Sequence, residues 1–159
     1  MDKKALEYFK KKDRILYQTA LKVKLEELKK PSDYFIDLID SIISQQLSGK
    51  AAATIFARFK KLFPKEKITA EELLKIPDQK IREAGISFSK IRYIKGIAEK
   101  IVNRELNLKE MEKLSDQEVI AELIKIKGIG IWTAEMFLIF TLFREDIFSA
   151  GDLGLQNAV

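Results

Sequence analysis

Two residue types that supply much of enzyme chemistry are missing from this chain of 159 residues, which contains no cysteine and no histidine. The lack of cysteine excludes disulfide bonds and thiolate metal sites. The lack of histidine removes the usual general base at neutral pH and the imidazole ligand common in metal sites. Metal chemistry that depends on thiolate or imidazole side chains is therefore excluded.

Helix breakers and long apolar runs are also scarce. Three prolines and seven glycines leave long uninterrupted windows of helical periodicity, and neither strand alternation nor a repeat of fixed period is present. We expect no signal peptide, and no apolar run reaches the roughly 18 residues that a membrane span requires. The sequence therefore predicts an all-α, soluble, intracellular protein without a membrane partner.

The net charge of +5 is unevenly distributed along the chain. Residues 1–30 hold ten Lys and Arg against five Asp and Glu, whereas the remainder holds nineteen of each sign. A basic excess is compatible with a nucleic-acid partner but does not identify one. The run Lys10-Lys11-Lys12 fits a phosphate contact or, more commonly, a solvated helix face.

The most informative stretch contains a glycine-rich turn between two apolar runs. Runs of helical periodicity at 123–127 and 131–143 flank a Gly-Ile-Gly turn at 128–130. Gly128 can adopt the left-handed conformation that ends a helix, and Gly130 has no Cβ to obstruct a ligand lying against the backbone. The second helix then offers unpaired amides to a phosphate oxygen, directly or through a bound cation. An ordinary corner between two helices is the alternative.

The residues after the turn extend the pattern. Trp132, Thr133 and Ala134 open the second run, and the loop before Asp152 is long enough to bring that carboxylate back to the turn. The pattern GIG-x-WTA followed by DLG resembles the helix-hairpin-helix superfamily of DNA glycosylases, from about residue 35 to the end. The resemblance implies that the hairpin grips the DNA backbone while Asp152 acts on the glycosidic bond of a flipped-out nucleotide.

The resemblance also implies a domain plan and a set of DNA contacts. The fold would be all-α and two-lobed, a single domain over 1–159, with residues 1–30 and the C-terminal end in one lobe and about 31–144 in the other. The hairpin residues that would contact DNA are Lys127, Gly128, Ile129, Gly130 and Thr133. The backbone at Lys127 and Ile129 is also a candidate site for a monovalent cation, with no side-chain metal ligand and no other cofactor.

One position separates the branches of this superfamily. Bifunctional members carry a Lys two residues after the second hairpin glycine, where this chain has Trp132, and an indole cannot form a Schiff base. We therefore expect no lyase activity, and the lack of cysteine excludes the iron–sulfur cluster of the endonuclease III type. Trp132 resembles the alkyl-base branch, 3-methyladenine DNA glycosylase II, where the indole lines the base pocket; core packing is its alternative. Tyr93 is a second pocket candidate, although we favour a place in the core for it.

A polar loop interrupts the pattern after the first predicted core helix, about Asp33 to Gln45. The buried stripe of that helix should be Phe35, Leu38, Ile39, Ile42 and Ile43. The segment SQQLS at 44–48 resembles the family's IIxQQLS segment, whose loop enters the minor groove. By position, Gln46 would fill the gap left by the flipped nucleotide, with Leu47 beside it and Gln45 in the same DNA-binding loop. On composition alone, this is an ordinary loop between helices.

The rest of the chain predicts further helices. They are expected in 1–30 (one or two, amphipathic), at 49–63, 70–76 and 78–84, from Ser87 or Ser89 to about 103, and after a capping box at Ser115. Residues 104–122 are acidic on balance and should face away from DNA. Lys90, Arg92 and Lys95 are expected to lie toward it.

The chemistry follows from the carboxylate. Hydrolysis of an N-glycosidic bond builds positive charge on the sugar, and Asp152 would stabilise that charge and orient the attacking water. Without a partner acid this suffices when the base is already cationic, as N3-methyladenine is, and Trp132 would attract such a base by cation–π interaction. Amides of a helix starting at Leu153 would keep Asp152 ionised. A simple N-cap is the alternative role of this Asp.

The sequence thus predicts a monofunctional DNA glycosylase that excises alkylated purines from duplex DNA in base excision repair. We expect a monomer, nucleoid-associated in a prokaryotic cytoplasm or nuclear in a eukaryote. A non-catalytic helix-hairpin-helix DNA-binding module and a helical scaffold binding protein remain open. Only Leu153 to Val159 follow Asp152, whereas family members continue through a further helix. The chain would then be an inactive truncated glycosylase, a shortened gene product, or a minimal form completed by its N-terminal helices.

Overall fold

The computed structural model describes residues 3–23 and 33–158, and helices are the only regular elements in these ranges. The α-helices are α1 (Lys3–Lys12), α2 (Arg14–Lys22), α3 (Tyr34–Ser44), α4 (Gly49–Lys60), α5 (Ala70–Lys75), α6 (Asp78–Glu83), α7 (Phe88–Val102), α8 (Asp116–Leu123), α9 (Ile131–Met136) and α10 (Leu153–Ala158). Short turns of other helical pitch are η1 (Pro64–Glu66), η2 (Glu110–Lys113) and η3 (Phe137–Thr141). The predicted all-α fold is confirmed.

Polar side chains define where these helices begin. Asp33 caps α3 by accepting hydrogen bonds from two amides of its first turn, at 2.8 and 3.4 Å. Ser87 rather than Ser89 caps α7. Ser115 and Glu118 form the predicted capping box of α8, which satisfies two amides reciprocally. Because each cap precedes an apolar periodic run, the sequence locates these helix starts within one residue.

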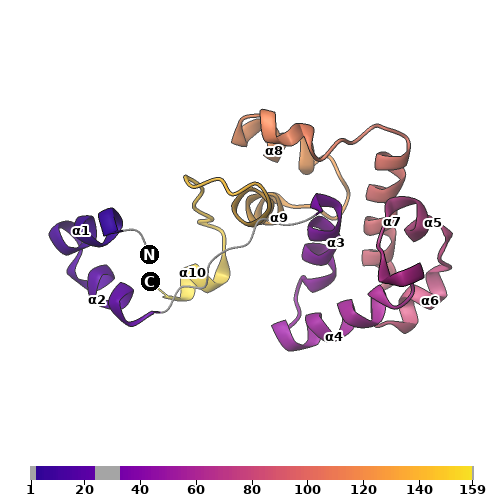
Figure 1. Cartoon of the computed structure of the whole chain (residues 1–159), viewed down its shortest axis with the longest axis horizontal. Helices are drawn as coiled ribbons and strands as arrows, with labels where there is room; N and C mark the ends of the chain where they lie inside the picture. The colour runs from indigo at the N-terminus through magenta and orange to yellow at the C-terminus, as the bar shows by residue number, and fades with distance from the viewer. Residues whose placement is uncertain (1–2, 24–32, 159) are drawn as a thin grey trace.

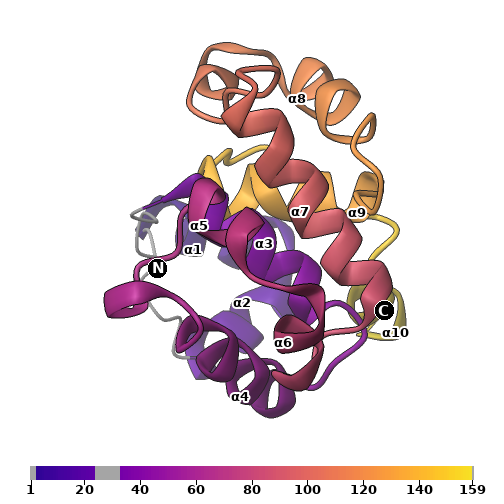
Figure 2. The ribbon, with the colours of Figure 1, turned by 90° about the vertical axis from the view of Figure 1, so that its right-hand side faces the viewer.

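Helix α3 lies at the centre of the core. Its predicted apolar stripe is buried: Phe35, Leu38, Ile39, Ile42 and Ile43. Helix α7 packs on one side of α3, and α9 with η3 packs on another, as Figures 1 and 2 show. The turn before α9 and the loop after α3 are therefore both attached to the same core helix.

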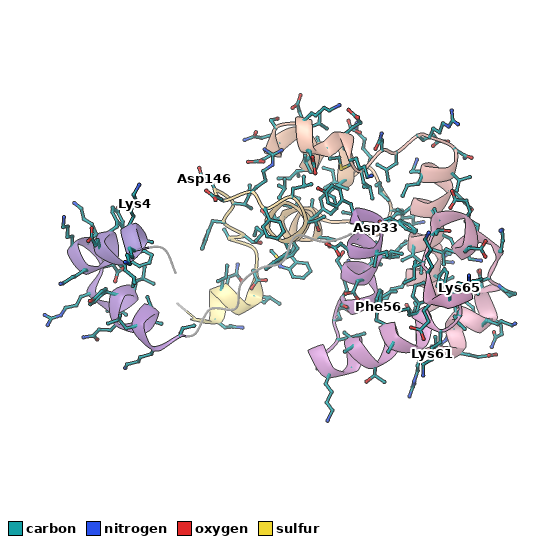
Figure 3. The ribbon with its side chains drawn as sticks, in the orientation of Figure 1. Lys4, Asp33, Phe56, Lys61, Lys65 and Asp146 are labelled. Atoms are coloured by element: carbon teal, nitrogen blue, oxygen red, sulfur yellow. The ribbon has the colours of Figure 1, made fainter. Side chains whose placement is uncertain are left out.

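Helices α1 and α2 pack against each other and contribute no buried residue. Along the long axis of the molecule, α10 lies between this pair and the core (Figure 1). Figure 3 marks the pair by Lys4 and shows side chains of α1 and α2 on several sides of it. Its large exposed apolar side chains are Tyr8, Ile15, Leu16, Leu21 and Val23. The predicted amphipathic helices of residues 1–30 are thus present over 3–22, and residues 1–2 and 24–30 lie outside the described residues.

We predicted continuous helices for the two apolar runs around the glycine turn, and this prediction is wrong for both runs. Helix α8 ends at Leu123, and residues 124–127 form turns in which the amide of Ile126 bonds to the carbonyl of Leu123. Helix α9 passes into the wider turn η3, where the amide of Leu142 reaches five residues back to Phe137. Apolar residues in both segments are buried without regular α-helix, because tertiary packing rather than periodicity decides their conformation.

Candidate active site

An aromatic ring packs directly against the glycine turn on its core side. Gly128 has φ +96°, a conformation that side chains with a Cβ rarely adopt. A Cβ at this position would lie 2.2 Å from Cδ2 of Tyr93, so the ring already occupies that space. Tyr93 is half-buried and packs against the hydrophobic core. The structure therefore places this candidate pocket residue beneath the turn, where it supports the hairpin.

The beginning of α9 is open to a ligand. Gly130 is its N-cap and has no side-chain capping bond, and a Cβ at Gly130 would meet nothing within 4 Å. The first three amides of α9 have no helix carbonyl one turn before them to which they could donate; they belong to Ile131, Trp132 and Thr133. The next amide, of Ala134, donates to the carbonyl of Gly130 at 3.0 Å. Three amides at an accessible helix start form an arrangement that suits an anion.

The carbonyl groups of the turn fit the candidate cation site. The Gly128 carbonyl accepts a hydrogen bond from Nε2 of Gln45 at 3.4 Å. The hydrogen bonds of the described residues leave the carbonyl oxygens of Lys127 and Ile129 without a donor. Hard cations prefer oxygen ligands of this kind. Within residues 3–23 and 33–158, no cluster of acidic, cysteine or histidine side chains offers a competing metal site.

Asp152 and Trp132 are joined directly. The indole Nε1 of Trp132 donates to Oδ2 of Asp152 at 2.7 Å. The backbone amide of Leu155 donates to Oδ1 at 2.9 Å, so Asp152 also caps α10. These two bonds, the Leu155 amide first, hold the pKa of the Asp152 carboxyl below its ordinary value. The lowered pKa favours the ionised carboxylate, as we expected from a helix that starts at Leu153. The carboxylate lies beside the open end of α9.

The loop that delivers Asp152 is anchored by two residues that the sequence analysis did not single out. Ser149 is only 2% exposed, and its Oγ donates to Oε2 of Glu135 in α9 at 2.5 Å. The amide of Asp152 donates to the carbonyl of Ser149 at 3.0 Å. Figure 3 shows Asp146 at the outer edge of this loop. The only sequence signal for the anchor was a carboxylate inside the apolar run that forms α9.

In the SQQLS loop, two residues are exposed to solvent and a third is hydrogen-bonded to the hairpin. Gln46 and Leu47 are exposed, and Gln46 has φ +59°, a left-handed conformation in a residue other than glycine. Gln45 is half-buried, and its Nε2 donates to Oγ1 of Thr133 at 3.2 Å as well as to Gly128. The Thr133 side chain is buried. Gln45 and Thr133 thus join the loop to the hairpin through their side chains, which leaves the Thr133 backbone for an outside contact.

Two lysines expected to lie toward DNA are turned inward instead. Lys90 Nζ donates to the carbonyls of Ile43 and Gln45, at 2.8 and 2.7 Å. Lys95 Nζ donates to the carbonyl of Ile76 at 2.7 Å and pairs with Asp78. Both ammonium groups satisfy carbonyl groups at helix ends, which attract cations because of the helix dipole.

Neither Trp132 nor Asp152 lines a cavity that the described residues form. One cavity of about 540 Å³ lies at the start of α3 and is remote in sequence from both residues. A second, about 310 Å³, lies between α3 and α9–η3, and its lining includes Asp40, Met136 and Phe140. Trp132, Met136 and Phe140 are spaced four residues apart, so they follow one face along α9 and η3. This second cavity continues the face that carries the indole.

Comparison with known proteins identifies the family of this chain. The family model of the HhH-GPD superfamily base excision DNA repair proteins matches residues 39–159. A DNA-3-methyladenine glycosylase 1 of Schizosaccharomyces pombe is 43% identical over 127 residues, 76% of this chain and 54% of the relative. A DNA-3-methyladenine glycosylase of Saccharomyces cerevisiae is 37% identical over 155 residues, 90% of this chain and 52% of the relative. The chain thus spans about half the length of these curated relatives.

Solved structures give the same result. The 3-methyladenine DNA glycosylase of Schizosaccharomyces pombe in complex with abasic DNA superposes with a TM-score of 0.84 at 36% identity, over 97% of this chain and 77% of that one. A DNA-3-methyladenine glycosidase of Bacillus halodurans gives a TM-score of 0.80 at 36% identity, over 98% of this chain and 71% of that one. The resemblance drawn from the hairpin and Asp152 is confirmed.

Proposed function

The chain belongs to the HhH-GPD superfamily of base excision DNA repair proteins, and on this premise we propose that it is a monofunctional DNA glycosylase that releases alkylated purines from duplex DNA. The observation that carries the proposal is the hydrogen bond between Trp132 and Asp152 beside the open end of α9. An ionised carboxylate, an aromatic face and a backbone anion site then lie within one short stretch. Those are the three parts that hydrolysis of a flipped cationic nucleotide requires.

The hairpin grips the DNA backbone. The amides at the start of α9 and the exposed Lys127 bind phosphate oxygens, and neither contact reads a base. A monovalent cation held by the carbonyls of Lys127 and Ile129 would add positive charge against the same phosphate. Gln46 and Leu47 enter the minor groove from the neighbouring loop and occupy the space that the flipped nucleotide leaves.

The flipped base is received on the face of α9 that carries the indole. The cavity of about 310 Å³ between α3 and α9 offers Met136 and Phe140 as apolar walls beyond Trp132. An electron-rich ring attracts a cationic base by cation–π interaction, whereas an undamaged purine is neutral. Selection for alkylated purines follows from that difference in charge.

Asp152 carries out the chemical step electrostatically. As the bond between C1′ and the base nitrogen lengthens, positive charge moves from the alkylated base to the sugar, where the carboxylate stabilises it. Water attacks C1′ and releases a proton to solvent, and the base takes the electrons of the broken bond and leaves as a neutral molecule, so no general acid has to protonate it. The position that could form an imine carries an indole, so the chain does not cleave the backbone by lyase chemistry.

The partner in this reaction is duplex DNA that contains alkylated bases, and the protein acts as a monomer at the nucleoid or in the nucleus. None of the helices in 3–23 and 33–158 is long and apolar enough to cross a lipid bilayer.

The test is the release of free methylated purine from alkylated duplex DNA, with Asp152→Asn beside the parent chain. Asparagine keeps the shape of the side chain but loses the negative charge, and its single oxygen can accept from Trp132 or from the Leu155 amide but not from both. We expect Asp152→Asn to bind duplex as the parent does and to release base at least about 100-fold more slowly, as for other lost transition-state charges. Release that is independent of Asp152 contradicts the mechanism. Duplex binding by the parent without release identifies a DNA-binding module instead.

A further inference from the structure

Gln45 lies at the junction of the two DNA-binding segments. It is the C-cap of α3, and the exposed Gln46 and Leu47 follow it directly. Its side chain donates across the core to Gly128 O at 3.4 Å and to Thr133 Oγ1 at 3.2 Å. One residue therefore contacts the turn, the start of α9 and the loop at once.

Lys90 fixes the other side of this junction. Its Nζ donates at 2.8 Å to the carbonyl of Ile43, in the last turn of α3, and at 2.7 Å to that of the C-cap residue Gln45. None of the ion pairs among the described residues involves Lys90. Burial lowers the pKa of its ammonium group. This partly buried ammonium group, which has no carboxylate partner among the described residues, is therefore satisfied by the backbone carbonyl groups from which the loop starts.

The loop needs such an anchor. Gln46 holds φ +59°, which costs free energy in a non-glycine residue and persists only where neighbouring contacts enforce it. A side chain that fills the gap in a duplex must also hold its position while base pairs close against it. Gln46 and Leu47 have no regular structure of their own, so this resistance has to come from residues on either side.

We propose that Lys90 and Gln45 are positioning residues that lock the Gln46–Leu47 loop to the hairpin, so that insertion into the minor groove and the grip on phosphate act as one rigid unit. This inference rests on the proposed function. Lys90 holds the loop's backbone and Gln45 ties it to the turn, and neither side chain has to touch DNA. Their effect therefore lies in flipping the nucleotide rather than in binding undamaged duplex.

The experiment compares Lys90→Met with Lys95→Met in the full chain. Both lysines lie in α7, both donate to a backbone carbonyl at a helix end, and methionine keeps most of the apolar stem of each. Lys95 bonds to Ile76 and Asp78 and is remote from the loop. The readouts are thermal unfolding, affinity for undamaged duplex, and flipping followed by 2-aminopurine fluorescence next to an abasic site. Lys90→Arg tests rescue, because a guanidinium can donate to two carbonyls.

We expect the two methionine variants to lose similar stability and to keep parental affinity for undamaged duplex. Lys90→Met should flip about 10- to 100-fold less, from the loss of charge-assisted hydrogen bonds, and Lys95→Met should flip as the parent does. Lys90→Arg should recover most of the flipping, and Gln45→Leu should reproduce the defect.

Equal flipping by Lys90→Met and Lys95→Met overturns the inference and leaves the proposed function intact. Flipping is measured without base release, so a parent chain that binds and flips without catalysis still tests the lock. A parent chain that does not bind duplex overturns both.

Discussion

A methyl group at Gly128 tests how the hairpin is held. The substitution Gly128→Ala imposes two separate costs, because φ is +96° and because the new Cβ would lie 2.2 Å from Tyr93 Cδ2 and 2.3 Å from Cγ. A left-handed conformation costs a residue with a Cβ about 1–2 kcal/mol. Overpacking against a ring that rests on the core adds about 1–3 kcal/mol. We expect a total loss of about 3 kcal/mol, a large part of the 5–15 kcal/mol typical of folded proteins.

Gly130→Ala is the matched control. A Cβ at Gly130 would meet nothing within 4 Å, and this residue has φ −98°, which any residue adopts. Gly130→Ala should therefore leave the free energy of unfolding almost unchanged. It should weaken duplex binding, because the methyl group stands where phosphate approaches the amides of α9. The two glycines thus separate a structural role from a ligand-binding role within one turn.

Urea and thermal unfolding, followed by the fluorescence of the single tryptophan, measure both variants. For a chain of this size, a loss of about 3 kcal/mol lowers the melting temperature by roughly 6–12 °C. Compared with Tyr93→Ala alone, the double variant Gly128→Ala/Tyr93→Ala has no overlap and keeps the left-handed conformation, so this difference isolates the backbone cost. A Gly128→Ala chain that melts within about 2 °C of the parent refutes the reasoning. Unchanged duplex binding by Gly130→Ala refutes the role assigned to the open amides.

Two further predictions concern charge at the site. Trp132→Phe removes one of the donors that lower the pKa of Asp152, so this pKa should rise toward its ordinary value. The ionised carboxylate is the active form and is lost as pH falls through the pKa, so base release should begin to decline at a higher pH than in the parent. ¹³C NMR of the carboxyl group measures the pKa directly. Lys127→Gln should weaken duplex binding equally for all sequences and reduce the slope of log K against log salt by about 0.9, whereas Lys113→Gln, in the acidic segment, should leave the slope unchanged.

The sequence predicts the parts of this protein whose signals are local. Caps at Ser87 and Ser115 and the stripe of α3 follow from hydrogen bonding and periodicity over a few residues, and the structure confirms them. The start of α10 beside Asp152 is of the same kind, because a carboxylate before a helix accepts from its first amides. The hairpin itself is recognisable because two glycines and the residues after them are contiguous.

Contacts between distant segments were not predictable in this way. Lys90 was expected to face DNA because a lysine on an amphipathic helix is usually solvated, and nothing near it in the sequence indicates that α3 ends beside it. The anchor between Glu135 and Ser149 likewise depends on how the loop folds back onto α9. Such contacts arise from packing over long sequence separations, which a periodic pattern does not encode.

These distant contacts explain how the hairpin is held in place although its own backbone forms no continuous helix. Residues 124–130 form no continuous helix, and Gly128 alone would leave the turn free to move. Tyr93 from α7 fills the space below the turn, and Gln45 from the end of α3 holds its carbonyl from the side. Because α3 and α7 pack in one core, displacement of the turn requires movement of both. The backbone amides at the start of α9 are therefore held in place by the core, and Trp132, two residues beyond the turn, connects them to Asp152 through its hydrogen bond.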